Sequence, residues 1–190
     1  EIMPSLVGSE MCIRDSPDGA GPTATTDRLV MGPALTVPYR CNFATDDQFA
    51  LWNVIDANND EYTWKRETTL AAAYYYYNED GETGGDDWLV SSPIHLEKNK
   101  IYRLKFKLQS YDVGYPEKVA VHLGTGASVA EQTTLLGDYE VESNTFVEYK
   151  VILPERLESG NYHISFHCHS EPYMFILYVT DVLLEEVSEG

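Results

Sequence analysis

The fold of this chain is decided by residues 101–110, which read Ile-Tyr-Arg-Leu-Lys-Phe-Lys-Leu-Gln-Ser. Apolar and polar side chains alternate along the whole stretch. Because successive side chains of a β-strand point to opposite faces, this alternation predicts a strand with one face in a core and the other in water. The row that we expect in the core consists of Tyr102, Leu104, Phe106 and Leu108.

Further strands are predicted on the C-terminal side. Residues 118–123, 146–153 and 161–169 alternate in the same way, and 175–184 is more continuously apolar, which is typical of a central strand. Turn-forming residues separate these segments. No stretch has helical spacing with caps, although Ser128–Leu135 is compatible with a short helical turn. Many short strands without helices predict an antiparallel sandwich or barrel.

The first 37 residues have a different character. Residues 6–16 read Leu-Val-Gly-Ser-Glu-Met-Cys-Ile-Arg-Asp-Ser, which matches the translation of a transposase adapter used to prepare sequencing libraries. We therefore interpret residues 1–16 as a sequencing artefact and conclude nothing from the lack of a signal peptide there. Residues 17–37 are rich in Gly, Pro, Ala and Thr and predict a linker.

Charge and cysteine content limit the possible partners. The 190 residues include 31 acidic and 13 basic side chains, a formal net charge of −18 at pH 7. Such a surface repels phosphate backbones and argues against nucleic acid as a partner. No apolar run approaches the roughly 20 residues that span a bilayer. Outside the artefact, Cys41 and Cys168 either pair in an oxidising compartment or, as we expect from their apolar strand rows, stay separate buried thiols.

Four separated motifs resemble one known family. They are Pro38–Phe43, Trp52–Asp60 with Trp64, the run Asp-Asp-Trp-Leu-Val-Ser-Ser-Pro-Ile at 86–94, and Gly160–Phe166 followed by Tyr178–Val182. In this order they resemble the cleaved-adhesin domains, also called choice-of-anchor J domains, over residues 38–187. The resemblance implies a bacterial secreted or cell-surface protein and a jelly-roll fold distantly similar to the MAM domain. The expected fold class is an all-β, antiparallel jelly-roll-like β-sandwich.

Signatures of catalysis are missing. The sequence has no G-x-S-x-G, H-E-x-x-H, phosphate-binding loop or dinucleotide fingerprint. Cys168 lies between His167 and His169, but adjacent side chains of a strand diverge, and so do Asp86 and Asp87. We therefore expect a protein that is not an enzyme.

The segment from Asp56 to Tyr62 is a candidate calcium site. Asp56, Asn58 and Asp60 carry oxygen ligands at every second position, and a chain that curls around a hard cation can bring them together. The resemblance also implies bound calcium, and Asp181 near the end of the last strand is a possible further ligand. The alternative is an acidic turn, since Asn and Asp favour turns on their own.

Histidines and tyrosines offer two weaker hypotheses. His163, His167 and His169 fall on one strand face, where imidazoles can hold zinc or copper, but we favour a solvated polar face because no fourth ligand is in sight. In the run of four tyrosines at 74–77, Tyr75 and Tyr77 are candidate ligand-binding residues. The alternative is packing beneath the Gly-rich loop 80–85. Trp52, Trp64 and Trp88 are expected in the core.

Together these features predict an accessory binding or adhesion module, stabilised by calcium. Its partners would be a glycan or a host or matrix protein, together with neighbouring domains of a longer chain. The alternative function is a structural spacer without a ligand, which holds a neighbouring enzyme or anchor away from the cell surface.

Overall fold

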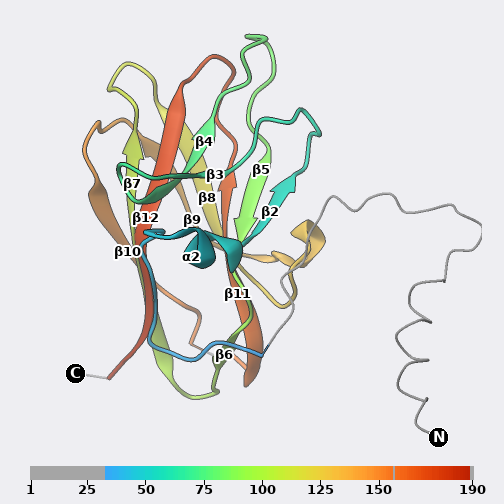
Figure 1. Cartoon of the computed structure of the whole chain (residues 1–190). Helices are drawn as coiled ribbons and strands as arrows, with labels where there is room; N and C mark the ends of the chain where they lie inside the picture. The colour runs from blue at the N-terminus through green and yellow to red at the C-terminus, as the bar shows by residue number, and fades with distance from the viewer. Residues whose placement is uncertain (1–32, 156, 189–190) are drawn as a thin grey trace, which may run out of the picture.

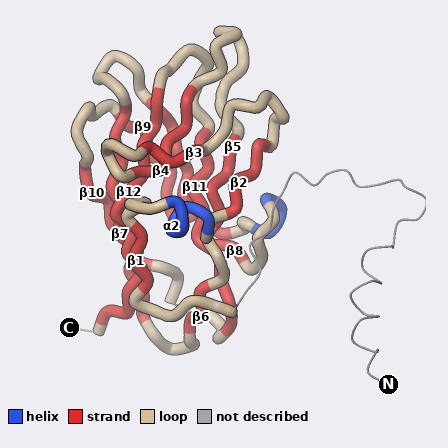
Figure 2. Tube along the Cα trace, viewed as in Figure 1, coloured by secondary structure: helices blue, strands red, loops and turns tan. Residues whose placement is uncertain are grey.

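The computed structural model describes residues 33–155 and 157–188 and consists of two six-stranded sheets packed as a sandwich (Figure 1). All pairings between its named strands are antiparallel. Figure 2 shows that helix is confined to short segments in the described part of the chain. The expected all-β, antiparallel jelly-roll-like sandwich is confirmed.

The first sheet contains the strand that decides the fold. Its order is β10-β7-β12-β4-β3, and β12 lies at its centre, as the apolar run predicted. β4 pairs with the N-terminal half of β12 and β1 with the C-terminal half, so the first and last strands of the sandwich are neighbours. The strands are β1 (Tyr39–Cys41), β3 (Lys65–Glu67), β4 (Ala72–Tyr76), β7 (Ile101–Ser110), β10 (Val147–Ile152) and β12 (Ile176–Val187).

The second sheet has the order β2-β5-β11-β8-β9, with β6 paired to the beginning of β11. β5 and β8 therefore flank β11 on opposite sides. The strands are β2 (Asn53–Asp56), β5 (Asp87–Val90), β6 (Ile94–Leu96), β8 (Glu117–Gly124), β9 (Thr134–Val141) and β11 (Gly160–Cys168).

The core lies between the two sheets. The predicted inward row of β7 is buried, and Phe106 meets Phe166 of β11 edge to face, with 5.3 Å between ring centroids. All three tryptophans are buried, Trp52 and Trp64 in this core as predicted and Trp88 in a separate small cluster with Ile55 and Val90. The inward row predicted for β10 is less buried, and Val147 is 40% exposed, because β10 is an edge strand of the first sheet.

The outer face of the second sheet corrects one expectation. His163 and Ser165 of β11, predicted on a solvated face, are 7% and 0% exposed. The 3₁₀ helix η1 (Val129–Glu131), in the segment where a helical turn was expected, brings Val129 against Trp88 and its neighbours on this face. Alternation therefore predicted the strand correctly, but it did not reveal that a connecting loop covers the polar row.

The sequence analysis also missed one short helix. α2 (Asp46–Ala50) begins at Thr45, whose hydroxyl accepts a hydrogen bond from the Gln48 N–H at 3.2 Å. The Gln48 side chain in turn accepts the Ala44 N–H at 3.0 Å. Thr-x-x-Gln is a helix-start signal, but at five residues the helix is too short for its apolar spacing to show.

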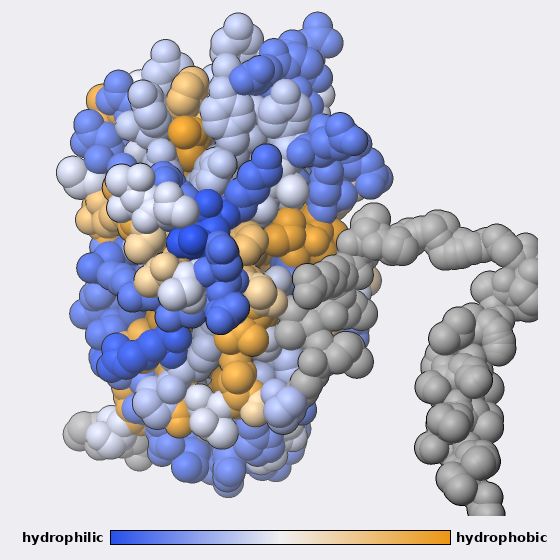
Figure 3. Space-filling view, viewed as in Figure 1, coloured by the Kyte–Doolittle hydropathy of each residue, from blue (hydrophilic) through white to orange (hydrophobic). Residues whose placement is uncertain are grey.

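The predicted artefact at residues 1–16 and most of the predicted linker, 17–37, lie outside the described residues. The Leu35 N–H donates to the Pro93 carbonyl at 2.8 Å, so contacts with the sandwich already begin there. No helix in the described part of the chain is long and apolar enough to cross a membrane. On the face shown in Figure 3, hydrophilic residues dominate and apolar residues reach the surface only in small patches.

Candidate functional site

Three carboxylates meet where β2 ends and β5 begins. Asp56, Asp60 and Asp87 each place one oxygen within 4.8 Å of the others. Asp56 is the last residue of β2 and pairs in register with Asp87, the first residue of β5. The loop that follows β2 curls back through left-handed backbone at Asn59 and Glu61, with φ of 55° and 71°. We call these three carboxylates the acidic cluster.

Hydrogen bonds fix the loop around the acidic cluster. The Asp56 carboxylate accepts the N–H groups of Asp60 and Glu61 at 3.2 and 2.7 Å. Asp60 accepts the Tyr62 N–H at 3.0 Å and the side-chain amide of Asn78 at 2.9 Å. The loop is therefore preorganised, with its carboxylates held together rather than spread into solvent.

Several buried oxygens at this site have no hydrogen-bond partner among the described residues. Asp87 is fully buried, its Oδ2 accepts the Asp86 N–H at 3.0 Å, and its Oδ1 has no hydrogen bond. The Oδ1 of Asn58 and the hydroxyl of Thr63 are likewise buried without a well-formed hydrogen bond to the described residues, although the Thr63 hydroxyl lies near the Asp87 carboxylate. Buried polar atoms in native proteins are almost always bonded to protein, water or an ion. A hard cation such as Ca²⁺ uses this set of carboxylate, amide and hydroxyl oxygens.

Electrostatics at the acidic cluster favour the same ligand. Burial, together with the charges of Asp56 and Asp60, raises the pKa of Asp87 to about 8 although the Asp86 N–H stabilises its ionised form. Three acids in a common, partly desolvated site repel one another, and a divalent cation converts that repulsion into coordination. The residues present therefore fit a calcium ion.

The structure brings part of the predicted ligand set together and places the rest elsewhere. Asp56 and Asp60 converge as expected, and the Asn58 side chain turns inward, with its amide donating to the Gly84 carbonyl at 3.2 Å. Asp181 does not join them, because it lies on the outer face of the first sheet and forms an ion pair with Lys107 at 2.9 Å. Asp87 takes the position that the sequence analysis gave to Asp181. Asp87 reaches the cluster through the pairing of β5 with β2, and a single sequence does not reveal which strands pair.

A second feature lies beside the acidic cluster, in the loops at the top of Figure 1. Phe175 is its centre, because the rings of Tyr111, Tyr77, Tyr76 and Tyr115 lie 4.5, 5.2, 5.7 and 6.2 Å from it. Tyr173 extends the group, 6.0 Å from Tyr77. We call these residues the aromatic end: Tyr76, Tyr77, Tyr111, Tyr115, Tyr173 and Phe175.

The aromatic end is open to solvent. Tyr173 is 63% exposed, Tyr111 51% and Tyr115 43%. These three residues come from the β7–β8 and β11–β12 loops, and no sequence period pointed to them. An exposed group of aromatic side chains at loop tips is typical of a binding surface.

Of the two tyrosines predicted to bind a ligand, only Tyr77 lies near the surface. The expectation that Tyr75 contacts a ligand is wrong, because its ring is 1% exposed and packs on Trp64 in the core. Tyr75 lies on the inward row of β4, and Tyr74 and Tyr76 form the outward row. Tyr77, the other candidate, belongs to the aromatic end and is half-buried against Phe175.

The two features are joined through shared loops. Tyr62, which follows the acidic cluster, stacks on Tyr76 with 6.4 Å between centroids. The Asn78 amide that bonds to Asp60 comes directly after Tyr77. Further along the same loop, the Gly85 N–H donates to the Ser170 carbonyl at 2.9 Å, in the loop that carries Tyr173. Ordering of the acidic cluster therefore orders the backbone beneath the aromatic end.

The histidines and cysteines do not form a site. The Nε2 of His167 contacts Asp86 and that of His169 contacts Asp138, each at 2.7 Å, whereas His163 contacts the Ser91 carbonyl. Among the described residues, no group of metal ligands includes a histidine. Cys41 and Cys168 are buried and form no disulfide with each other, as expected. Burial raises the pKa of the Cys168 thiol, which leaves it unreactive.

Comparisons with known proteins give the fold a wider context. No protein-family model and no curated protein matches the chain. The K1 cleaved adhesin domain of Lys-gingipain from Porphyromonas gingivalis W83 is similar, with a TM-score of 0.65 and 19% identity, over 80% of this chain and 99% of that domain. The K3 cleaved adhesin domain of the same protein gives 0.60 and 19%, over 77% and 96%.

A carbohydrate-binding module is also similar. The CBM22-2 xylan-binding domain from Paenibacillus barcinonensis Xyn10C has a TM-score of 0.52 and 8% identity, over 78% of this chain and 99% of that domain. At these identities the likeness concerns the fold alone. The chain thus has the β-sandwich fold of the cleaved adhesin domains that its four motifs resemble.

Proposed function

We propose that this domain is a non-catalytic accessory module of a secreted or cell-surface bacterial protein, and that its aromatic end binds a glycan. A calcium ion in the acidic cluster holds the loops beneath that end. The observation that carries the proposal is the exposed aromatic group on loops that the acidic cluster braces.

Sugar chemistry supports a glycan as the ligand of the aromatic end. A tyrosine ring offers an apolar face to the C–H groups of a sugar and a hydroxyl at its edge for hydrogen bonding. Tyr111, Tyr115 and Tyr173 present both to solvent. A domain of similar fold in Xyn10C is described as xylan-binding, and those of Lys-gingipain are described as adhesin domains.

Calcium follows from the unpartnered oxygens of the acidic cluster. Asp56, Asp60 and Asp87 provide carboxylates, and Asn58 and Thr63 provide further buried oxygens. Calcium accepts six to eight oxygen ligands in variable geometry, whereas magnesium demands a near-ideal octahedron. An irregular loop of mixed oxygen donors therefore favours calcium.

Two other functions are the alternatives to glycan binding. A host or matrix protein is a second class of ligand, because exposed tyrosines also anchor protein interfaces. A spacer that binds nothing is the alternative from another class. It requires no exposed aromatic group, and so the aromatic end favours a binding module over it.

A glycan array with calcium and then with a chelator tests the proposal. We expect a set of neutral or weakly charged glycans to bind, and binding to fall when the chelator loosens the loops under the aromatic end. The double variant Tyr115→Ala/Tyr173→Ala should weaken binding of the best glycan about 10-fold or more, measured by calorimetry.

Leu135→Ala/Ile152→Ala provides the matched control, since both residues are apolar, more than half exposed and outside the aromatic end. It should leave affinity unchanged. The proposed ligand surface is contradicted if the protein binds no glycan on the array, or if the aromatic and control doubles behave alike. A protein ligand or the spacer function would then remain.

A further inference from the structure

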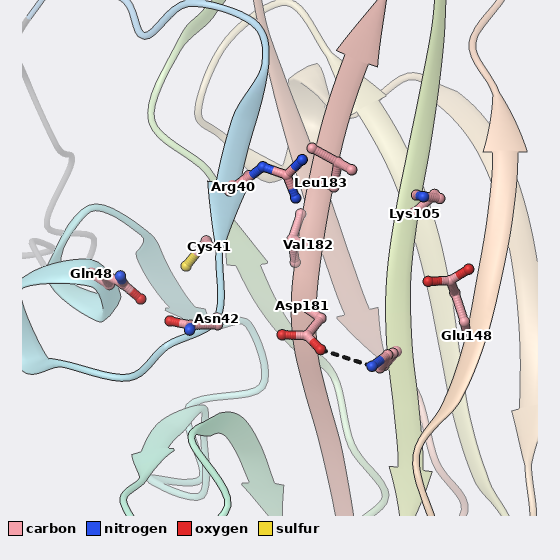
Figure 4. Close-up of a pocket in the computed structure, with 10 residues that line it drawn as sticks. Arg40, Cys41, Asn42, Gln48, Lys105, Glu148, Asp181, Val182 and Leu183 are labelled. Atoms are coloured by element: carbon pink, nitrogen blue, oxygen red, sulfur yellow. Dashed lines mark ion pairs between the residues drawn. The ribbon is translucent and has the colours of Figure 1, made fainter. Parts of the chain in front are cut away.

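A groove crosses the outer face of the first sheet, away from the aromatic end. Its volume is about 400 Å³, within the range of small-ligand sites. Figure 4 shows Arg40 reaching from β1 toward Leu183 on β12, with Lys105 on the neighbouring strand β7. We call it the basic groove and define it by Arg40, Asn42, Gln48, Lys105, Lys107 and Leu183.

Strand register places the cations of the basic groove in a row. Arg40 lies opposite Leu183, Leu183 opposite Lys105, and Lys105 opposite Lys150 of β10. Three basic side chains therefore share one line across four strands, with an apolar side chain between the first two. In a chain with 31 acidic and only 13 basic residues, this row concentrates basic groups, and it lies beside the carboxylates of Glu148 and Asp181 in the same lining.

Arg40 and Lys105 are the cations of the basic groove that remain available to a ligand, because their basic neighbours are already paired with carboxylates. Lys107 is neutralised by Asp181 at 2.9 Å, and Arg103 by Glu185 at 2.7 Å. Lys105 has only a distant contact with Glu185, at 3.9 Å. Among the described residues, Arg40 has no carboxylate within 4.0 Å. A guanidinium and an ammonium beside an open groove offer strong donors to an oxyanion.

Neutral groups in the basic groove also donate. The Oδ1 of Asn42 and the Oε1 of Gln48 both accept the Ala44 N–H, at 3.1 and 3.0 Å. Their amide NH₂ groups have no hydrogen-bond acceptor among the described residues, and both residues line the groove. The carboxylates of Asp181 and Glu148 are the acceptors in the lining. The ligand that complements this lining carries an anionic group and several hydroxyls.

We infer that the basic groove binds an acidic sugar unit of a glycan, with its anionic group between Arg40 and Lys105. The hydroxyls of the sugar reach the amides and carboxylates of the lining. β1 and β10 at the sides of the groove are edge strands, but its floor consists of β12 and β7, which are paired on both sides, so a peptide has no free strand edge to extend within the groove. The position of the hydroxyl-binding groups thus favours a saccharide.

The net charge of the chain restricts which acidic glycan fits. A formal charge of −18 repels any dense polyanion at long range, whereas a mostly neutral glycan with one acidic unit escapes that repulsion. The basic groove therefore selects sparsely charged glycans. The choice of a glycan rests on the proposed function, but the groove and the aromatic end are different surfaces whose ligands are tested separately.

Calorimetric titration with defined oligosaccharides tests the inference. Xylotriose with one glucuronic acid and lactose with one sulfate probe the carboxylate and sulfate sources, and xylotetraose and lactose are their neutral controls. At least one acidic probe should bind about 10-fold or more tightly than its neutral control. Arg40→Ala/Lys105→Ala should remove that advantage, and Arg40→Lys should keep part of it.

Lys98→Ala/Lys100→Ala makes the same change in charge in the turn before β7 and should leave affinity for the acidic probe unchanged. Four results would each overturn the inference. The control double loses as much affinity as Arg40→Ala/Lys105→Ala, the neutral sugars or hexaglutamate bind as tightly as the acidic probes, or no probe binds at millimolar concentration. Tyr115→Ala/Tyr173→Ala should bind the acidic probe like the unaltered protein. If the aromatic end binds nothing, that result contradicts the proposed function and leaves the groove standing.

Discussion

Two buried carboxylates flank Cys168 on opposite sides of β11, and they have opposite surroundings. Asp87 begins β5 and Glu117 begins β8, and both are fully buried. Both oxygens of Glu117 are bonded, because Oε1 accepts the Ser170 hydroxyl at 2.6 Å and Oε2 accepts the Phe175 N–H at 2.8 Å. Asp87 has one oxygen without a partner and two carboxylates as neighbours.

The pKa values of both carboxyls are raised by burial, but different neighbours add to or oppose that rise. Burial raises the pKa of Asp87 to about 8 and that of Glu117 to about 7. Around Glu117 the hydrogen bonds from Ser170 and Phe175 oppose the rise. Around Asp87 the hydrogen bond from the Asp86 N–H opposes it as well, but the charges of Asp56 and Asp60 add to it. Glu117 is thus a completed structural link to the loop of the aromatic end, and Asp87 is incomplete until a cation arrives.

The largest expected effect is the loss of the Glu117 link. Glu117→Ala leaves the Ser170 hydroxyl and the Phe175 N–H without their acceptor in a buried place and should reduce the free energy of unfolding by about 3–4 kcal/mol. Urea denaturation measures the change. Glu142→Ala, at an exposed residue after β9, should shift it by less than about 0.5 kcal/mol. Equal stability of the two variants would show that Glu117 does not hold the loop.

Added calcium should stabilise the protein through the acidic cluster that contains Asp87 and not through Glu117. At a free concentration 100 times the dissociation constant, calcium should stabilise the protein by about 2.7 kcal/mol through binding to the folded state alone. Calorimetric melting with calcium and then with a chelator measures this shift. An unchanged melting temperature would reduce the acidic cluster to an acidic turn.

Variants at the two sites sharpen that result. Asp87→Asn should abolish the calcium shift, because the cluster loses a charged ligand. Glu117→Gln should keep it, because Glu117 lies outside the cluster. In the chelator, Asp87→Asn should be as stable as the unaltered protein or more so, since it no longer buries a third acid beside Asp56 and Asp60.

The same contrast shows what the sequence could predict. Strand alternation located β7, β8 and β11 because one face of each packs on the core, and burial imposes period two on the sequence. The acidic loop was visible because Asp56, Asn58 and Asp60 are neighbours along the chain. These are local properties, which a single sequence carries in full.

Properties that depend on pairing between distant strands were missed. Asp87 reaches Asp56 only through the register of β5 with β2, and Asp181 is removed from the site by its place beside Lys107. Tyr75 and Tyr77 have the same parity, yet Tyr75 is in the core and Tyr77 lies beyond the end of β4. The aromatic end assembles from three loops that are distant in sequence, so its members share no period.

The smallest expected effect is a dependence of stability on pH that belongs to Glu117. Its pKa rises from 4.5 to about 7 on folding, so between these values the folded state binds more protons than the unfolded state. Stability from this group is therefore fully present below about pH 4.5 and is lost as the pH rises through about 7. Between pH 5 and 7 the loss should amount to about 2 kcal/mol.

Glu117→Gln should remove this slope, because an amide accepts the Phe175 N–H without titrating. The difference between the two proteins in urea denaturation at each pH isolates Glu117 from all other groups, and parallel curves would show that its carboxyl ionises as freely in the folded chain as in the unfolded one.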